Sequence, residues 1–312
     1  MSDTLVSVWQ AARDRLIAAG VESPVLDARL LLEAGAGVTR LEIVTDPRRA
    51  LSADQVAAVN ALVDRRVARE PVSHIVGKKA FWTLDLHVTP DVLTPRPETE
   101  FLVEVALTAL PKTSPARVLD LGVGSGAVLL SVLSERDLVS GIGLDISADA
   151  LAVAQGNAEM LELDNRAEFH RGDWSTNFPE QFDVVLANPP YIPSGDIEHL
   201  APEVSKHEPR IALDGGPDGL DAYRAIIAKL NDWLKPGGTF AFEIGQGQAA
   251  DVEALVTAGG FTLLPTRADL AGIPRVVSGR RPDDPPHEIP LGSGQERHYS
   301  PCRNRALTWS AG

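Results

Sequence analysis

The residues best suited to chemistry form an Asn-Pro-Pro-Tyr tetrad at positions 188–191. A short apolar run at 182–187 leads into the tetrad, which predicts a buried parallel strand ending at the ligand-binding edge of a sheet. The prolines fix the backbone and offer no N–H group, so the Asn188 side-chain oxygen and a neighbouring carbonyl can accept both hydrogens of a planar NH2 group. Tyr191 can cover that group by stacking. The alternative is a proline-rich turn with a packing tyrosine.

A second candidate site is the glycine-rich turn G-x-G-x-G that follows an apolar run at 118–121. Glycines at alternate positions let a ligand approach the backbone closely. Asp145 ends the next apolar stretch, where an acid can bind the hydroxyls of an adenosine ribose. A third predicted strand, 167–171, leads to Asp173 and Trp174, which can hydrogen-bond and flank an adenine. The candidate cofactor-binding residues are therefore Gly122, Val123, Gly124, Ser125, Gly126, Asp145, Asp173, Trp174 and Asn188.

Two cofactors fit this turn, a dinucleotide and S-adenosylmethionine. Dinucleotide sites usually carry the third glycine one residue later, as G-x-G-x-x-G, to hold a pyrophosphate at a helix N-terminus. This turn has a different spacing, and no acid–base pair suited to hydride transfer is evident. Because S-adenosylmethionine has no phosphate, the pattern favours it.

Composition narrows the possible classes of protein. The 312 residues carry a net charge of −14, which argues against a broad phosphate-binding surface and a nucleic-acid partner. A single cysteine, Cys302, excludes an intrachain disulfide, and no Cys/His spacing is typical of a metal site. The sequence shows neither a signal-peptide pattern nor a long apolar run, so we expect a cytoplasmic protein without a membrane segment.

The elements that must position the candidate residues follow from hydrophobic spacing. Helical spacing up to about residue 70 predicts a small bundle, suited to docking a partner or covering a site. Alternation at 79–88 predicts a strand or hairpin with Ala80 and Leu86 on one face and Phe81 on the other. Strands then alternate with helices, which predicts an α/β fold with a mostly parallel, doubly wound sheet. The expected segments are a helical substrate-docking domain at 1–72, a bridging β-hairpin at 73–95, a cofactor-binding catalytic domain at 96–280 and a disordered tail at 281–312.

Taken in order, the glycine turn, Asp145, the Asp173–Trp174 pair and the tetrad resemble a class I methyltransferase that acts on nitrogen. Three further stretches narrow this resemblance: Pro-Val-Ser-His-Ile-Val-Gly at 71–77, Thr-Pro-Arg-Pro-Glu-Thr-Glu at 94–100, and Asp-Leu-Ala-Gly-Ile-Pro-Arg at 269–275. With them, residues 5–280 resemble the HemK/PrmC family, the N5-glutamine methyltransferases of peptide chain release factors.

The resemblance implies a class I, Rossmann-like methyltransferase domain that uses S-adenosylmethionine. It also implies methyl transfer to the side-chain amide nitrogen (N5) of the glutamine in the Gly-Gly-Gln (GGQ) loop of class 1 release factors. We expect a monomer, although the sequence itself does not reveal the oligomeric state. The glycines would admit the methionine part of the cofactor, Asp145 would bind the ribose and Trp174 would flank the adenine. The catalytic and substrate-binding residues implied are Asn188, Pro189, Pro190 and Tyr191.

Two other functions stay open on the residues alone. An Asn-Pro-Pro-Tyr tetrad could equally hold the amino group of an adenine or cytosine in nucleic acid, although the acidic balance disfavours this. A non-catalytic cofactor-binding adaptor, with the bundle as its working part, is the third reading. The sequence assigns no substrate contact to Arg96, Glu98 or Glu208.

Overall fold

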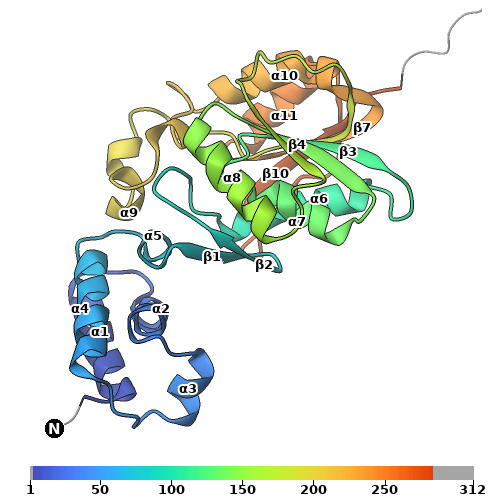
Figure 1. Cartoon of the computed structure of the whole chain (residues 1–312). Helices are drawn as coiled ribbons and strands as arrows, with labels where there is room; N and C mark the ends of the chain where they lie inside the picture. The colour runs from blue at the N-terminus through green and yellow to red at the C-terminus, as the bar shows by residue number, and fades with distance from the viewer. Residues whose placement is uncertain (1–2, 284–312) are drawn as a thin grey trace, which may run out of the picture. The chain divides into compact units, whose positions relative to one another are not determined.

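The first part of the chain is a bundle of helices with its own core. The computed structural model describes residues 3–283. The bundle helices are α1 (Leu5–Ala18), α2 (Pro24–Ala36), α3 (Arg40–Thr45) and α4 (Ala53–Val67) (Figure 1). Side-chain caps from Thr4, Thr39 and Ser52 begin α1, α3 and α4, so local sequence sets these helix starts. Their apolar stripes bury Leu5, Leu16, Leu31, Leu32, Val59 and Val63 together.

A short helix and a hairpin follow the bundle: α5 (Val72–Val76), β1 (Lys78–Phe81) and β2 (Leu84–His87). The expected hairpin is present, but the predicted faces are wrong, because Phe81 is buried with Leu86 while Ala80 is exposed. The chain reverses after Phe81, so Phe81 pairs with Leu84 and shares a face with Leu86. A single uninterrupted alternation cannot describe two strands joined by a turn.

The remaining strands form one sheet in the order β5-β4-β3-β6-β7-β10-β8, with β9 paired to β10. The first five are parallel neighbours, and β10 runs antiparallel to β7. The strands are β3 (Ala116–Leu121), β4 (Val139–Asp145), β5 (Ala167–Arg171), β6 (Phe182–Ala187), β7 (Leu234–Glu243), β8 (Thr262–Leu263), β9 (Arg267–Ala268) and β10 (Pro274–Arg280).

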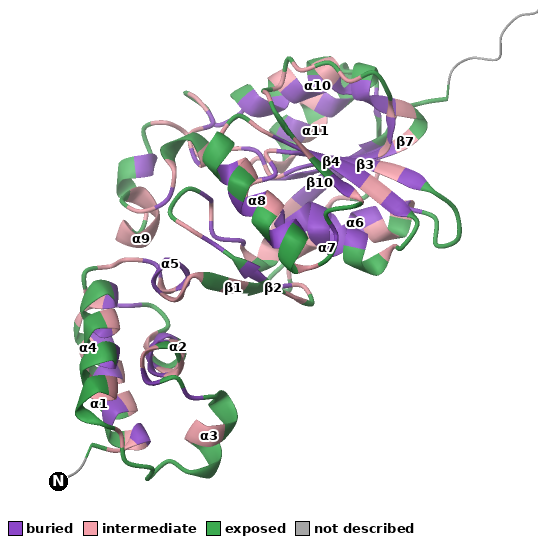
Figure 2. Cartoon of the chain, viewed as in Figure 1, coloured by how far each residue is buried: buried purple, intermediate pink, exposed green. Residues whose placement is uncertain are grey.

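Helices cover both faces of this sheet. One core joins the sheet to α6 (Glu100–Ala109), α7 (Ala127–Glu135) and α8 (Ala148–Met160), and the other joins it to α10 (Asp221–Trp233) and α11 (Ala249–Ala258) (Figures 1 and 2). Consecutive residues of β3, Val118 and Leu119, enter opposite cores. The expected α/β class with a mostly parallel, doubly wound sheet is therefore confirmed. Short elements η1 (Pro97–Thr99), η2 (Ile197–His199), α9 (Pro202–Ser205) and η3 (Arg210–Ala212) lie in the connections.

The register of the parallel strands brings the candidate residues to one edge. Leu121 pairs with Leu144 and with Ala187, and Ala187 pairs with Phe242. The residues that follow these strand positions therefore meet at the carboxyl edge of the sheet, where open α/β folds bind ligands.

Two further predictions concern membrane-spanning helices and the C-terminal tail. Within residues 3–283, every helix is too short or too polar to cross a membrane. The predicted disordered tail, with Cys302, lies outside the described residues from position 284 onward.

Candidate active site

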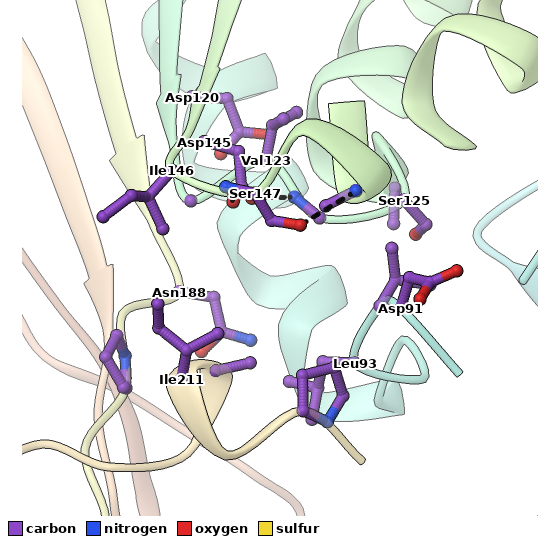
Figure 3. A pocket seen from close by; sticks show the side chains of 18 of the residues that line it. Asp91, Leu93, Asp120, Val123, Ser125, Asp145, Ile146, Ser147, Asn188 and Ile211 are labelled. Carbon is purple, nitrogen blue, oxygen red and sulfur yellow. Dashed lines mark hydrogen bonds between the residues drawn. The ribbon is translucent and has the colours of Figure 1, made fainter. Parts of the chain in front are cut away.

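A cavity of about 300 Å³ opens at the carboxyl edge of the sheet. Most of the predicted site residues line it: Gly122, Val123, Gly124, Ser125, Asp145, Asp173, Trp174, Asn188 and Pro190. Gly126, Pro189 and Tyr191 are not among its lining residues. Figure 3 shows side chains from the glycine turn, from the 91–93 loop and from the tetrad surrounding one space.

The glycine turn forms the cofactor side of the cavity. Gly122 has φ +74°, a left-handed conformation that a residue with a Cβ adopts only under strain. A Cβ there would lie 3.5 Å from the ring of Trp174 and 3.9 Å from the carbonyl oxygen of Asn188. Gly126, which precedes α7, also has a positive φ, and a Cβ there would come within 2.9 Å of the Leu130 side chain in that helix. The turn therefore exposes bare backbone toward the cavity.

Asp145 holds the glycine turn through its carboxylate. Its Oδ2 accepts a hydrogen bond from the Gly124 N–H (2.9 Å), and its Oδ1 accepts one from the Ser147 N–H (3.0 Å). Asp145 is half-buried and lines the cavity (Figure 3). Because an ionised carboxylate has about four acceptor positions, lone pairs remain for a ligand hydroxyl.

Asp120 is a site residue that the sequence analysis did not single out. It lines the cavity, is 2% exposed and accepts a hydrogen bond from the Leu129 N–H (3.1 Å). Burial raises its pKa to about 7, the Leu129 bond lowers it, and the nearby charge of Asp145 adds to the increase. The sequence feature that could have identified Asp120 is its position as an acid inside the apolar strand at 116–121.

The next strand end carries Asp173 and Trp174. The Asp173 carboxylate accepts hydrogen bonds from the Oγ and N–H of Ser175 (2.6 and 2.8 Å), which lower its pKa. Asp173 thus shapes the turn that presents Trp174. Trp174 is half-buried and lines the cavity, with Cη2 of its ring near the Gly122 backbone.

The tetrad lies beside the glycine turn, because Leu121 pairs with Ala187 on the neighbouring strand. Asn188 is half-buried, and its Nδ2 donates to the Thr99 hydroxyl over 3.3 Å. Pro189 is buried. The carbonyl of Tyr191 accepts from Gln248 Nε2 (2.9 Å), and its ring lies 3.0 Å from where a Cβ on Gly245 would stand. Burial raises the pKa of the Tyr191 phenol well above its usual range, so it is neutral.

The sequence assigned no substrate contact to Arg96, Glu98 or Glu208. In the structure, each of these residues contacts another charged side chain. Arg96 donates to Glu208 over 2.6 Å, and the buried Glu208 also accepts from the Thr94 N–H over 3.3 Å. Glu98 lies 4.0 Å from Arg275. These contacts tie the 94–98 segment to the chain that follows the tetrad. Within residues 3–283, no cluster of His, Cys, Asp or Glu could hold a metal ion.

Both the N-terminal helices and the sheet domain match families of known proteins. Residues 7–77 match the family model described as PrmC N-terminal domain, and residues 98–204 match the methyltransferase small domain. The release factor glutamine methyltransferase of Caulobacter vibrioides is 55% identical over 280 residues, covering 89% of this chain and 97% of that protein. The enzymes of the same name from Rhodospirillum rubrum and Coxiella burnetii are 45% and 42% identical, covering 86% and 83% of this chain and 82% and 93% of those proteins.

Among solved structures, the hMettl16 catalytic domain, in complex with a 3′UTR hairpin, aligns with a TM-score of 0.53 at 13% identity. The alignment covers 64% of this chain and 76% of that one. At this identity the likeness concerns the fold alone, and it agrees with the doubly wound sheet described above.

Proposed function

Since this chain belongs to the release factor glutamine methyltransferase family, we propose that it methylates N5 of the glutamine in the GGQ loop of class 1 release factors. It is an S-adenosylmethionine-dependent enzyme that methylates a release factor glutamine. The finer assignment rests on one observation: a half-buried asparagine lines the cavity beside a bare glycine turn.

The cavity residues fit S-adenosylmethionine. Gly122 leaves room where a side chain would meet the Trp174 ring, and Asp145 keeps acceptor positions free for ribose hydroxyls. Trp174 offers a flat face to an adenine. When bound, the cofactor supplies a methyl group on a positively charged sulfur. The cofactor-binding residues proposed are Gly122, Val123, Gly124, Ser125, Gly126, Asp145, Asp173, Trp174 and Asn188.

We propose that the tetrad binds and activates the glutamine amide. An amide nitrogen is a poor nucleophile because its lone pair is shared with the carbonyl. The Asn188 Oδ1 and the Pro189 carbonyl would accept the two N–H groups, which returns electron density to nitrogen as positive charge develops. These acceptors also fix the direction of the nitrogen. Pro190 and Tyr191 would pack against the glutamine side chain.

No strong general base is required in this scheme. A methylated amide that still carries its extra proton is very acidic and loses that proton readily. The residues that line the cavity include no histidine, which is compatible with this chemistry.

The remaining assignments are proposals about the whole protein. The helices at 1–72 would dock the release factor, the hairpin at 73–95 would join them to the catalytic domain, and that domain would span 96–280. We propose that the enzyme acts as a monomer in the cytoplasm, without nucleic acid as a substrate, in line with its net charge of −14.

The test is methyl transfer from labelled S-adenosylmethionine to three acceptors. These are an intact class 1 release factor, the same factor with its GGQ glutamine changed to alanine, and duplex DNA. Label on the intact factor alone is the expected result. Label on the alanine variant would place the modification elsewhere in the factor, and label on DNA would move the enzyme to the base-modifying class.

A further inference from the structure

The buried carboxyl of Glu243 has no part in the proposed reaction, yet it lies beside the tetrad. Because Ala187 pairs with Phe242, the next residues on these parallel strands, Asn188 and Glu243, end at the same level of the sheet. Glu243 is 3% exposed, and its Oε2 has no hydrogen-bond partner among the described residues. Burying an acid with an unpaired oxygen is energetically unfavourable, so such a residue in a native structure often has a functional role.

Thr99 connects this acid to the tetrad. It stands between η1 and α6 with a right-handed helical backbone (φ −65°, ψ −19°), so its side chain makes no cap hydrogen bond and its hydroxyl is free to bond elsewhere. The Thr99 hydroxyl accepts from Asn188 Nδ2 (3.3 Å), and as a hydrogen-bonding neighbour of Glu243 it lowers the pKa of that carboxyl. Thr99 is 4% exposed, so water does not compete freely for its hydroxyl.

The direction of these hydrogen bonds follows from the chemistry of the groups. An ionised carboxylate only accepts, so Thr99 donates its single hydrogen to Glu243 and offers a lone pair to the Asn188 NH2. With Nδ2 bound in this way, Oδ1 is the free end of the Asn188 side chain. Resting on the proposed function, we propose that Thr99 and Glu243 are positioning residues that orient the Asn188 amide so that its oxygen receives the substrate N–H.

Orientation matters because the two ends of an asparagine amide have nearly the same shape and opposite polarity. A flipped Asn188 would present its own N–H groups to the N–H groups of the substrate glutamine. That pairing makes no hydrogen bond and leaves a desolvated donor unsatisfied. Fixing the amide therefore separates a productive site from one of equal shape that cannot activate the substrate.

The orientation of the Asn188 amide depends on the charge of Glu243. Burial raises its pKa to about 7, while the Thr99 hydrogen bond lowers it. Below that pH the protonated carboxyl can donate as well as accept, so the direction of the Thr99 hydroxyl is no longer fixed. The titratable and charged groups that act on Glu243, or are acted on by it, are Glu98, Arg275, Arg96, Tyr191 and Tyr223.

The experiment compares Thr99→Val with Thr99→Ser in the full-length enzyme. Valine keeps the shape and removes the hydroxyl, so kcat toward an intact release factor should fall by about tenfold or more. Serine keeps the hydroxyl, so kcat should stay within about threefold of the wild type. The Kd of S-adenosylmethionine should be unchanged in both. Thr108→Val, in the same helix and on the exposed side, controls for the substitution itself.

Two readouts distinguish orientation from a loss of structure. In NMR spectra of the cofactor-free protein, the Asn188 side-chain amide signal, assigned by its loss in Asn188→Asp, should move in Thr99→Val and not in Thr108→Val. In wild type, kcat/KM for the release factor should rise with pH through about 7, as Glu243 ionises. Glu243→Gln should flatten this rise, because its amide does not titrate.

Several outcomes would overturn the inference. These are equal activity of Thr99→Val and wild type, equal loss in the valine and serine variants, an unmoved Asn188 signal, or an unchanged pH rise in Glu243→Gln. Asp120, whose pKa is also raised to about 7, would produce a pH effect on the cofactor Kd instead. If wild type itself transfers no label to the release factor, the proposed function fails, and the Asn188 signal still tests the orientation.

Discussion

At the scale of residues, the proposed roles of Asn188 and Asp145 differ. Asn188 lines the cavity and is proposed to bind the substrate, whereas Asp145 uses two acceptor positions on the backbone N–H groups of Gly124 and Ser147. These different environments give each residue its own expected signature in binding and turnover.

Replacing Asn188 tests the acceptor role. Asn188→Ala should abolish turnover and leave the Kd of S-adenosylmethionine within about threefold, because it removes a contact made to the reacting nitrogen. Single-turnover methylation and calorimetric titration of the cofactor measure the two effects. Parallel loss of binding and turnover would mean that the Asn188 side chain serves the cofactor alone and has no separate role on the substrate amide.

Replacing Asp145 should have the opposite profile. Asp145→Ala removes the proposed ribose acceptor and also frees the Gly124 and Ser147 N–H groups, so cofactor Kd should rise by about tenfold or more. At saturating cofactor, turnover should recover much of its wild-type value. Asp145→Asn is the matched control, since it keeps the size of the side chain. An unchanged Kd in the alanine variant would contradict the assignment.

The buried acids predict how stability depends on pH. The pKa of Asp120 rises from an ordinary 3.8 to about 7 on folding, so the folded state binds more protons than the unfolded state between these values. Stability must therefore fall as pH rises through this window, and the loss is complete above about pH 7. Glu243 has the same sign, from 4.5 to about 7.

Urea unfolding between about pH 5 and pH 8 measures this slope. Asp120→Asn keeps an acceptor for the Leu129 N–H and removes the titration, so its unfolding free energy should depend less on pH. A slope equal to that of wild type would show that Asp120 does not titrate in this range.

At the scale of elements, the βα turn depends on glycine for its conformation. Gly122→Ala places a Cβ at φ +74°, which should cost about 1 kcal/mol or more and bring the methyl group toward Trp174. We expect a lower Tm and weaker cofactor binding, measured by thermal unfolding and titration. Gly156→Ala is the control, since its Cβ meets nothing within 4 Å inside α8 and should stabilise the helix. Equal effects of both changes would contradict this account.

At the scale of the whole molecule, the helical bundle is tied to the chain that follows the tetrad. Arg66 pairs with Asp27 inside the bundle (2.7 Å) and with Glu203 of α9 (2.9 Å), and Arg69 pairs with Glu203 as well (2.7 Å). Arg66 is 5% exposed, so its two pairs are shielded from solvent, whereas Arg69 is more exposed. The segment that holds α9 continues to Ile211, which lines the cavity.

Loosening this tie should affect the substrate more than the cofactor. Glu203→Gln leaves Arg66 and Arg69 with a weaker partner, so hydrogen exchange of amides at 197–214 should accelerate and the KM for the release factor should rise several-fold. Glu198→Gln, an exposed change in the same segment, serves as the control. Unchanged exchange in Glu203→Gln would exclude the bundle as a support for this segment.

The sequence by itself determined the elements and the residues at their ends. Apolar runs and glycine turns are local, so β5 and β6 begin and end where the spacing predicts. The order of Gly122, Asp145, Trp174 and Asn188 after successive strands placed them at one edge, because parallel strands share a direction. The segment boundaries at 72, 95 and 280 stay predictions.

Only the tertiary structure decided which distant side chains meet. Thr99 lies 89 positions from Asn188, so no spacing rule links them. The burial of Asp120 and Glu243, and hence their raised pKa values, depends on two cores closing over the sheet. The faces of the hairpin likewise depended on where the chain turns after Phe81. Local pattern records what each segment prefers, whereas hydrogen bonds and desolvation between segments exist only once the chain has packed.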